Sequence, residues 1–158
     1  MKFKKNIVLT AAVLIIAAVM TILSGCSADK TLVLTDGDTG EIYAKYPAAE
    51  GAEFSVTFTH SVNKTDVTET YQIRDGKIWL TGCIYYGFGA GVATEMEEGW
   101  ELSYGEDGSM VISGIEMQMH DLTYKVGTVS DHTLRIDGEA VSLRDLCGRN
   151  SSVEFALR

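Results

Sequence analysis

The chain has 158 residues, of which 46% are hydrophobic and 22% charged, and its formal net charge at pH 7 is −9. This length suits one domain with a single hydrophobic core and leaves no room for a second large domain. The acidic balance argues against nucleic acid as a partner, because an acidic surface repels a polyanion.

The first 25 residues have the features of a lipoprotein signal peptide. In order, the segment contains three lysines, an apolar run and a small-residue motif that ends in cysteine: Lys2, Lys4, Lys5, residues 7–23 and Leu23-Ser24-Gly25-Cys26. The apolar run approaches the length of about 17 residues at which a helix begins to span a bilayer, so an uncleaved anchor is the alternative. The small residues before the cysteine resemble a lipobox and favour cleavage before Cys26, with acylation (palmitate) of its thiol.

Cleavage would divide the chain into a signal peptide (residues 1–25), a short tether (26–30) and one domain (31–158). It removes three lysines and no acidic residue, so the formal charge would change from −9 to −12. Because such a surface is repelled by anionic lipid, attachment to the membrane would come from the lipid anchor. We therefore expect a protein held at the extracytoplasmic side of the cell membrane.

From residue 31 onward, short apolar alternations broken by Gly, Asp and Asn are typical of antiparallel β-structure. The fold class that this pattern predicts is all-β, a β-sandwich or a small closed barrel of about ten strands with one short helix. The predicted strands are Leu32–Thr35, Glu41–Tyr46, Glu53–Ser61, Asp66–Arg74, Lys77–Tyr86, Trp100–Tyr104, Ser109–Ile115, Leu122–Val126, Thr133–Ile136 and Ser152–Leu157.

Four Asp-Gly steps, at residues 36–37, 75–76, 107–108 and 137–138, predict tight turns between strands. The helix is expected at Leu143–Leu146, where Ser142 is a suitable N-cap and Asp145 follows in the first turn. Once Cys26 is acylated, Cys83 and Cys147 remain. They either form one disulfide or stay as two separate buried thiols, and no spacing rule decides between these alternatives.

A hairpin in the middle of the chain carries polar residues on an apolar face. Phe54, Val56, Phe58 and His60 share one face of the third predicted strand, and the parity of the fourth strand puts Glu69 among its apolar residues. A turn around Asn63-Lys64 would pair Phe54 with Ile73, Val56 with Tyr71, Phe58 with Glu69 and His60 with Val67. In that register His60 and Glu69 are diagonal neighbours, with backbones roughly 7 to 8 Å apart.

Two interpretations of His60 and Glu69 follow. In the first, the imidazole donates to Glu69 or to a backbone carbonyl and closes one end of the core, because buried polar groups need partners. In the second, the carboxylate orients an imidazole whose other nitrogen binds a ligand or a metal.

Gly87-Phe88-Gly89-Ala90-Gly91 follows a strand that is apolar on both faces. No helix suitable for a dinucleotide site follows it, so the segment is either a rim around a small ligand or a partner's backbone, or a bulged turn at a barrel corner. Residues 36–41 lack the full ligand pattern of a calcium loop, and three scattered histidines give little support to zinc. The sequence therefore predicts no cofactor and no metal, and it contains no catalytic signature, including the Gly-x-Ser-x-Gly elbow of serine hydrolases.

The string Phe58-Thr-His-Ser-Val-Asn-Lys-Thr-Asp-Val-Thr-Glu69 resembles the domain of unknown function eighteen-fifty family. The resemblance continues through Tyr86–Gly91, His132-Thr133-Leu134 and Ser142-Leu143, and it covers about residues 31–158. Members of this family are typically encoded beside TAXI-type TRAP transporters, which use a binding protein and a fused permease to import organic acids with sodium. No activity is established for the family.

The resemblance implies an extracytoplasmic accessory or binding module that works with a TRAP permease or a TAXI solute receptor. The alternatives are a small metal-dependent or histidine-based hydrolase and a structural envelope lipoprotein, and we expect that the protein is not an enzyme. The candidate ligand-binding or partner-binding residues are His60, Ser61, Lys64, Thr65, Glu69, Phe88, Gly89, Gly91 and His132.

Overall fold

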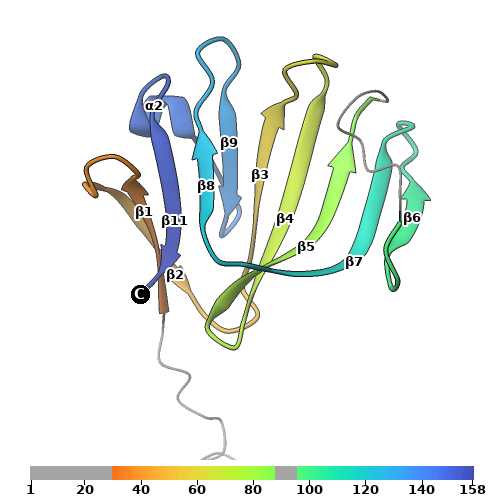
Figure 1. Cartoon of the computed structure of the whole chain (residues 1–158), viewed down its shortest axis with the longest axis horizontal. Coiled ribbons are helices and arrows are strands. Elements are labelled where there is room, and N and C mark those ends of the chain that lie inside the picture. Colours follow the sequence, from red (N-terminus) through yellow and green to blue (C-terminus); the bar gives the residue numbers. More distant parts are fainter. Residues whose placement is uncertain (1–29, 88–95) are drawn as a thin grey trace, which may run out of the picture.

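A computed structural model describes residues 30–87 and 96–158, and these form two antiparallel sheets that pack face to face (Figure 1). The strands of the described residues are β1 (Lys30–Asp36), β2 (Ile42–Ala48), β3 (Glu53–Thr59), β4 (Asp66–Arg74), β5 (Lys77–Tyr85), β6 (Glu101–Tyr104), β7 (Met110–Met119), β8 (Leu122–Lys125), β9 (His132–Ile136), β10 (Glu139–Ser142) and β11 (Ser152–Leu157), and the helix is α2 (Leu143–Cys147).

One sheet has the order β2-β1-β11-β8 and the other has the order β10-β9-β3-β4-β5-β7-β6. The all-β prediction is confirmed as a sandwich, and the closed barrel is wrong because the strands form two separate sheets. Apart from β10, each described strand overlaps a predicted one. Nowhere in residues 30–87 and 96–158 is there a helix both long and apolar enough to cross a membrane.

Two of the Asp-Gly steps form the tightest hairpins. Asp75 and Gly76 have φ values of 51° and 64°, and Asp137 and Gly138 have 51° and 79°. Positive φ at both central residues is the geometry of a type I′ turn, which matches the twist of the strands on either side. The second turn leads directly into β10. The sequence did not predict this strand, because Glu139 and Ala140 interrupt the apolar alternation there.

The helix begins where the sequence predicted, at Leu143, and ends one residue later than predicted, at Cys147. The Ser142 hydroxyl accepts a hydrogen bond from the backbone N–H of Asp145 at 3.0 Å, which satisfies one of the free donors of the first turn. Leu143 is fully buried, so this short helix closes one end of the core.

The inner face of the seven-stranded sheet positions the candidate residues. Directly paired residues lie on the same side of a sheet, so the pairings define rows that run from β9 to β6. One row comprises Leu134, Val56, Glu69, Cys83, Ile112 and Leu102. The next row toward the β3–β4 loop comprises His132, Phe58, Val67, Tyr85, Met110 and Tyr104.

The four-stranded sheet covers only part of this face. The main core lies between the two sheets and contains residues of β3, β4 and β9 with residues of β1, β8 and β11. A second, smaller cluster lies on β5 and β7, around Cys83, Met110, Ile112 and Ile115. In Figure 1 the strands β5, β7 and β6 extend beyond the four-stranded sheet.

Candidate functional site

A cluster of oxygen atoms lies inside the sandwich around Glu69. The Tyr71 hydroxyl donates to Glu69 Oε2 at 2.9 Å, and the Tyr124 hydroxyl, which comes from the opposite sheet, donates to the same oxygen. The two phenol oxygens are 2.6 Å apart. Tyr71 and Tyr124 are buried and Glu69 is half-buried, so the carboxylate gains its hydrogen bonds from within the core.

The two tyrosines stay protonated under ordinary conditions. Burial raises the pKa of both phenols well above the usual range, and the nearby Glu69 carboxylate raises it further. Neutral phenols are hydrogen-bond donors to a carboxylate, so Glu69, Tyr71 and Tyr124 form a mutually satisfied network that joins the two sheets.

His132 lies beside this network, on the end of β9. Its ring stacks on Phe58 with centroids 5.5 Å apart and meets the edge of Tyr124 at 5.8 Å. Burial lowers the pKa of His132, although the charges of Asp131 and Glu69 act in the opposite direction. The predicted candidates Glu69 and His132 are therefore brought together on one inner face, with aromatic rings between them.

Asp131 ties this end of β9 to the helix. Its carboxylate accepts from the backbone N–H groups of His132 at 2.7 Å and Arg144 at 3.0 Å, and from the Ser142 hydroxyl. Burial by itself would raise the pKa of Asp131, but these hydrogen bonds lower it overall. The charged form of Asp131 therefore holds the start of β9 against the N-terminal end of helix α2.

The predicted pair of His60 and Glu69 does not form. The strands pair two residues out of the predicted register, so that Val56 lies opposite Glu69 and Phe58 opposite Val67. His60 instead belongs to the β3–β4 loop, where its Nδ1 accepts from the backbone N–H groups of Val62 at 3.3 Å and Asn63 at 3.5 Å. Its role in the structure is to close this turn, so neither predicted partnership of His60 with Glu69 applies.

The other candidates of the hairpin, Ser61, Lys64 and Thr65, lie in the same loop. Lys64 has a φ of 57°, and its backbone N–H donates to the His60 carbonyl at 2.9 Å. A Cβ added to Gly87 would come within 2.5 Å of the Thr65 side chain, so the first glycine after β5 is in direct contact with this loop. Phe88, Gly89 and Gly91 lie outside the described residues.

The contact between Thr65 and Gly87 joins two neighbouring segments, which we call the distal loops: residues 60–65 with Tyr86 and Gly87. Val62 is 65% exposed and Tyr86 is 47% exposed, while Lys64 is exposed beside Val62 in the same loop. Sequence reasoning did not select Val62 and Tyr86. Their exposure could have been predicted from the sequence, since both are large, largely apolar residues next to residues that favour turns.

The disulfide alternative is wrong, because Cys83 and Cys147 are free thiols. Cys83 belongs to the cluster on β5 and β7, whereas Cys147 packs against the main core at the end of α2. Burial raises the pKa of Cys83 to about 12 and that of Cys147 to about 11. Both thiols are therefore poor nucleophiles.

In the described parts of the chain, no three or more His, Cys, Asp or Glu residues are grouped so that they could hold a metal ion. Among the described residues, the Glu69 carboxylate accepts hydrogen bonds from the Tyr71 and Tyr124 hydroxyls, and His132 is enclosed by aromatic rings and by the backbone of Gly127. The chemistry that this arrangement offers is hydrogen bonding and aromatic contact.

Comparison with known proteins identifies one family. Neither a curated protein nor a solved structure matches the chain. The model of the family described as "Domain of unknown function (DUF1850)" matches residues 54–143, which include the distal loops, Glu69 and His132. Because this match covers more than half of the chain, the protein belongs to the DUF1850 family.

Proposed function

We propose that this protein is a lipid-anchored extracytoplasmic module that binds the solute receptor of a TAXI-type TRAP uptake system through its distal loops. The observation that carries the proposal is the position of these loops at the end of the sandwich opposite the start of β1 (Figure 1). Lys30, the first described residue, contacts the β4–β5 turn, since its Nζ donates to the Gly76 carbonyl at 3.2 Å. The distal loops lie at the other end of β4.

The lengths of the chain segments support this arrangement. Three residues lie between Cys26 and Lys30, and the four steps from one Cα atom to the next span at most about 14 Å when the chain is extended. β4 has nine residues, which rise about 30 Å in total. A domain anchored at Cys26 thus keeps one end close to the bilayer and can hold the distal loops about 30 Å farther out, beyond the headgroups, where a soluble protein can reach them.

The composition of the distal loops suits a protein partner. An exposed aromatic ring, an exposed branched side chain and an ammonium group lie together there, in a domain that is otherwise strongly acidic. Aromatic residues are enriched at the centres of protein interfaces, where they bury a large area at a small cost in entropy.

The test uses a photocrosslinking amino acid placed in the full-length protein in its native membranes. At position 62 or 86 we expect a crosslinked product with the solute receptor, identified by mass spectrometry. Position 121, which is exposed between β7 and β8 at the anchored end, is the control. A product with the receptor only at position 121, or none at 62 and 86, would contradict the proposal.

A second measurement tests the anchor separately. Labelled palmitate should be incorporated into the wild-type protein and not into Cys26→Ser, and the variant should leave the membrane fraction. If Cys26→Ser remained in the membrane after washing at high salt, the proposed lipid attachment would be wrong.

A further inference from the structure

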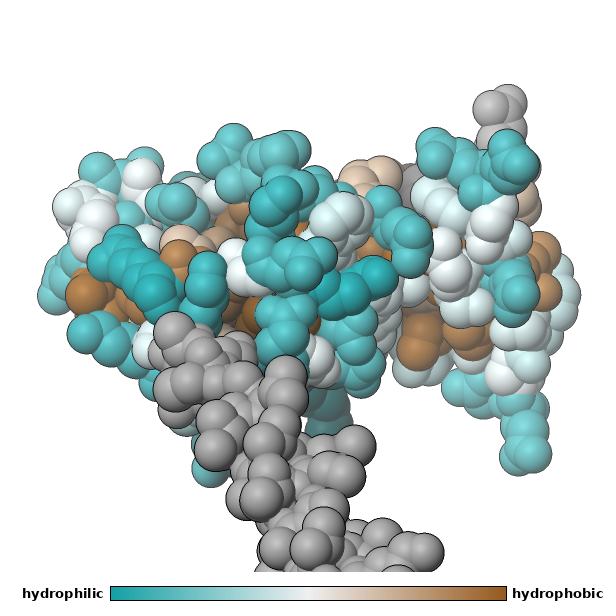
Figure 2. Space-filling view, turned by 90° about the horizontal axis from the view of Figure 1, so that it is seen from below, coloured by the Kyte–Doolittle hydropathy of each residue, from teal (hydrophilic) through white to brown (hydrophobic). Residues whose placement is uncertain are grey.

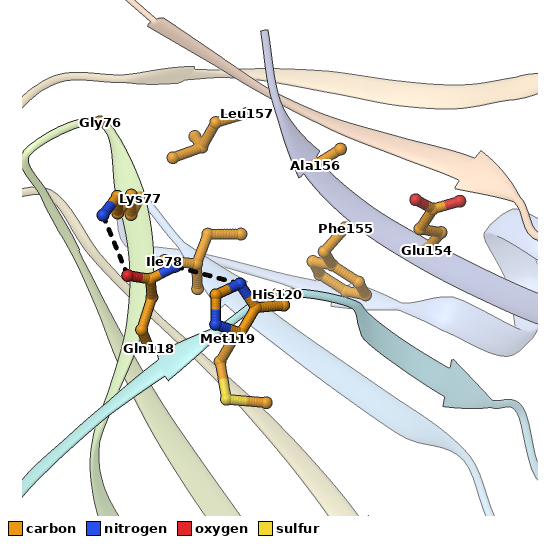
Figure 3. A pocket seen from close by; sticks show the side chains of 10 residues that line it. All are labelled: Gly76, Lys77, Ile78, Gln118, Met119, His120, Glu154, Phe155, Ala156 and Leu157. Carbon is orange, nitrogen blue, oxygen red and sulfur yellow. Dashed lines mark hydrogen bonds between the residues drawn. The ribbon is translucent and has the colours of Figure 1, made fainter.

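The pocket between the two sheets at the anchored end has apolar side chains inside it. It has a volume of about 290 Å³, and Ile78, Met119 and Phe155 point into it (Figure 3). Lys77 and Glu154 alternate with inward-facing residues, so they project from the outer faces of the two sheets. Figure 2 views this end of the molecule, where hydrophilic residues predominate on the surface and hydrophobic residues lie between them. Neither of the two charges is therefore aimed into this pocket.

A hollow on the outer face of the seven-stranded sheet has a different lining. We call it the outer groove; it has a volume of about 340 Å³ and is lined by Thr57, Asp66, Thr68, Tyr86 and Arg135. Each of these residues is next in the chain to a residue that points to the inner face. Because successive side chains of a strand point to opposite faces, all five side chains project outward and line the groove together.

Arg135, at one side of the groove, has a free guanidinium. It is exposed, and it makes no hydrogen bond or ion pair with any residue that the structure describes. Arg74, on the same outer face, is instead ion-paired with Glu116 at 3.2 Å and lies over the Trp79 ring at 5.3 Å. The chain has 22 acidic residues against 13 lysines and arginines, so an arginine without a carboxylate partner is unusual for this protein. Its fork of N–H donors matches the carboxylate of a ligand.

The other side of the groove carries an acid and an aromatic ring. Asp66 Oδ1 accepts from the Thr59 hydroxyl at 2.9 Å. The backbone N–H of Tyr86 donates to the Asp66 carbonyl at 3.0 Å, so these two residues are neighbours across the strands. On the floor, the Thr57 and Thr68 hydroxyls are 2.8 Å apart. One of these hydroxyls donates to the other, which leaves one hydroxyl hydrogen for a ligand.

Arg135 and Asp66 lie too far apart to form an ion pair with each other. Arg135 is paired through Ser55 with Thr70, two strands away, and Asp66 precedes Thr70 by four residues. At about 4.8 Å per strand and about 3.3 Å per residue, their Cα atoms are roughly 16 Å apart. The two side chains together reach roughly 10 Å when extended, at about 1.5 Å per bond, so the remaining gap is at least about 6 Å.

We infer that the outer groove binds a small zwitterion of the α-amino acid class. Its carboxylate lies on Arg135, its ammonium group on Asp66 and its side chain against the ring of Tyr86. Such a molecule spans about 9 Å, which comprises two hydrogen bonds of about 2.9 Å and about 3 Å between its own charged groups. The groove volume of about 340 Å³ lies within the usual range for ligand pockets.

Recognition in the outer groove requires both charges of the ligand. A charge-assisted hydrogen bond forms at each end of the zwitterion. A molecule with only a carboxylate leaves Asp66 unpaired and places like charges near each other, and a molecule with only an ammonium group does the same at Arg135. The groove should therefore prefer an amino acid to either singly charged analogue.

The outer groove adjoins the distal loops, because Tyr86 belongs to both. Amino acid binding does not depend on the proposed receptor, since it is measured on this protein alone. Arg135 and Asp66 lie outside the distal loops, and they are the positions that the test changes. Loss of amino acid binding and loss of receptor crosslinking are therefore separate results.

The test compares three ligands with the same carbon skeleton: leucine, leucinamide and 4-methylpentanoate. The second has only the ammonium group, which is protonated at about pH 6.5, and the third has only the carboxylate. Binding to the purified full-length protein in lipid nanodiscs is followed by saturation-transfer NMR, with empty nanodiscs as the blank. We expect saturable binding of leucine, about tenfold tighter than that of either analogue.

Two variants should remove one preference each. Arg135→Gln should weaken leucine binding about tenfold and abolish the advantage of leucine over leucinamide. Asp66→Asn should abolish its advantage over 4-methylpentanoate. Arg149→Gln, which removes an exposed arginine of the loop before β11, should leave all three affinities unchanged.

Circular dichroism should show that each variant keeps its β-structure, as expected for exposed positions. The comparison of the three ligands on the wild-type protein decides the question even if a variant fails to fold. The inference is overturned if leucine does not saturate, if it binds no more tightly than both analogues, or if the folded Arg135→Gln and Asp66→Asn variants keep the wild-type preferences.

Discussion

Two leucines of one row in the seven-stranded sheet lie in opposite environments. Leu134 of β9 is fully buried, whereas Leu102 of β6 is 45% exposed, although both point to the inner face of the sheet. Between them the row passes through Val56, Glu69 and Cys83. This difference shows that the alternation of apolar and polar residues along a strand identifies the side chains that point to the inner face. Whether such a side chain is buried depends on whether the four-stranded sheet extends over it.

The largest difference is expected between alanine substitutions at these two leucines. Leu134→Ala removes fully buried methyl groups and leaves a cavity, so it should lower the free energy of unfolding by about 2 to 5 kcal/mol. Leu102→Ala should lower it by less than about 1 kcal/mol, because the site is half open and lies on an edge strand. Denaturant unfolding followed by tryptophan fluorescence measures both, and equal losses would show that β6 is covered as fully as β9.

The reactivity of Cys83 reports how well the middle of the row excludes water. A thiol whose pKa has risen from 9.0 to about 12 carries about a thousandfold less thiolate at pH 8. We therefore expect very slow alkylation of Cys83 in the folded protein and faster alkylation of the less deeply buried Cys147. After unfolding without reductant, mass spectrometry should show that both have reacted, and failure of both to react would indicate a disulfide.

Substitution of Glu69 tests the hydrogen bonds that its carboxylate, in the same row, accepts from the Tyr71 and Tyr124 hydroxyls. Glu69→Ala leaves the buried hydroxyls of Tyr71 and Tyr124 without their carboxylate acceptor, which should cost about 1 to 3 kcal/mol of unfolding free energy. Glu69→Gln keeps an acceptor oxygen and should cost less. The matched control is Glu101→Ala on the exposed strand β6, for which we expect a change within about 0.5 kcal/mol. A similar loss in both alanine variants would mean that the tyrosine network contributes nothing specific.

The smallest effect concerns His132, next to this row. Because folding lowers its pKa, the unfolded chain binds the proton more tightly, and stability falls as the pH drops below the unfolded value near 6.5. The unfolding free energy of His132→Gln should therefore depend less on pH between 7 and 5 than that of the wild type. His120→Gln controls for the loss of an imidazole as such. An unchanged slope in His132→Gln would show that solvent reaches this ring freely.

The prediction of the β3–β4 hairpin shows where local patterns stop being informative. The predicted faces were correct, since Phe54, Val56 and Phe58 share the inner face with Glu69. The predicted register was wrong by two residues. A shift of two preserves the alternation of faces, so the pattern of apolar residues cannot distinguish the two registers. The six-residue loop that contains His60 and Lys64 sets the register, and its hydrogen bonds depend on the folded backbone.

The sequence by itself determined the β-structure, the inner faces of the strands and the Asp-Gly turns, because these depend on neighbours within a few residues. Only the tertiary structure decided which groups meet across longer separations. Tyr124 reaches Glu69 from 55 positions away and from the other sheet, and the four-stranded sheet covers β9 but not β6. Such contacts depend on how two sheets pack, and no local pattern of residues encodes that geometry.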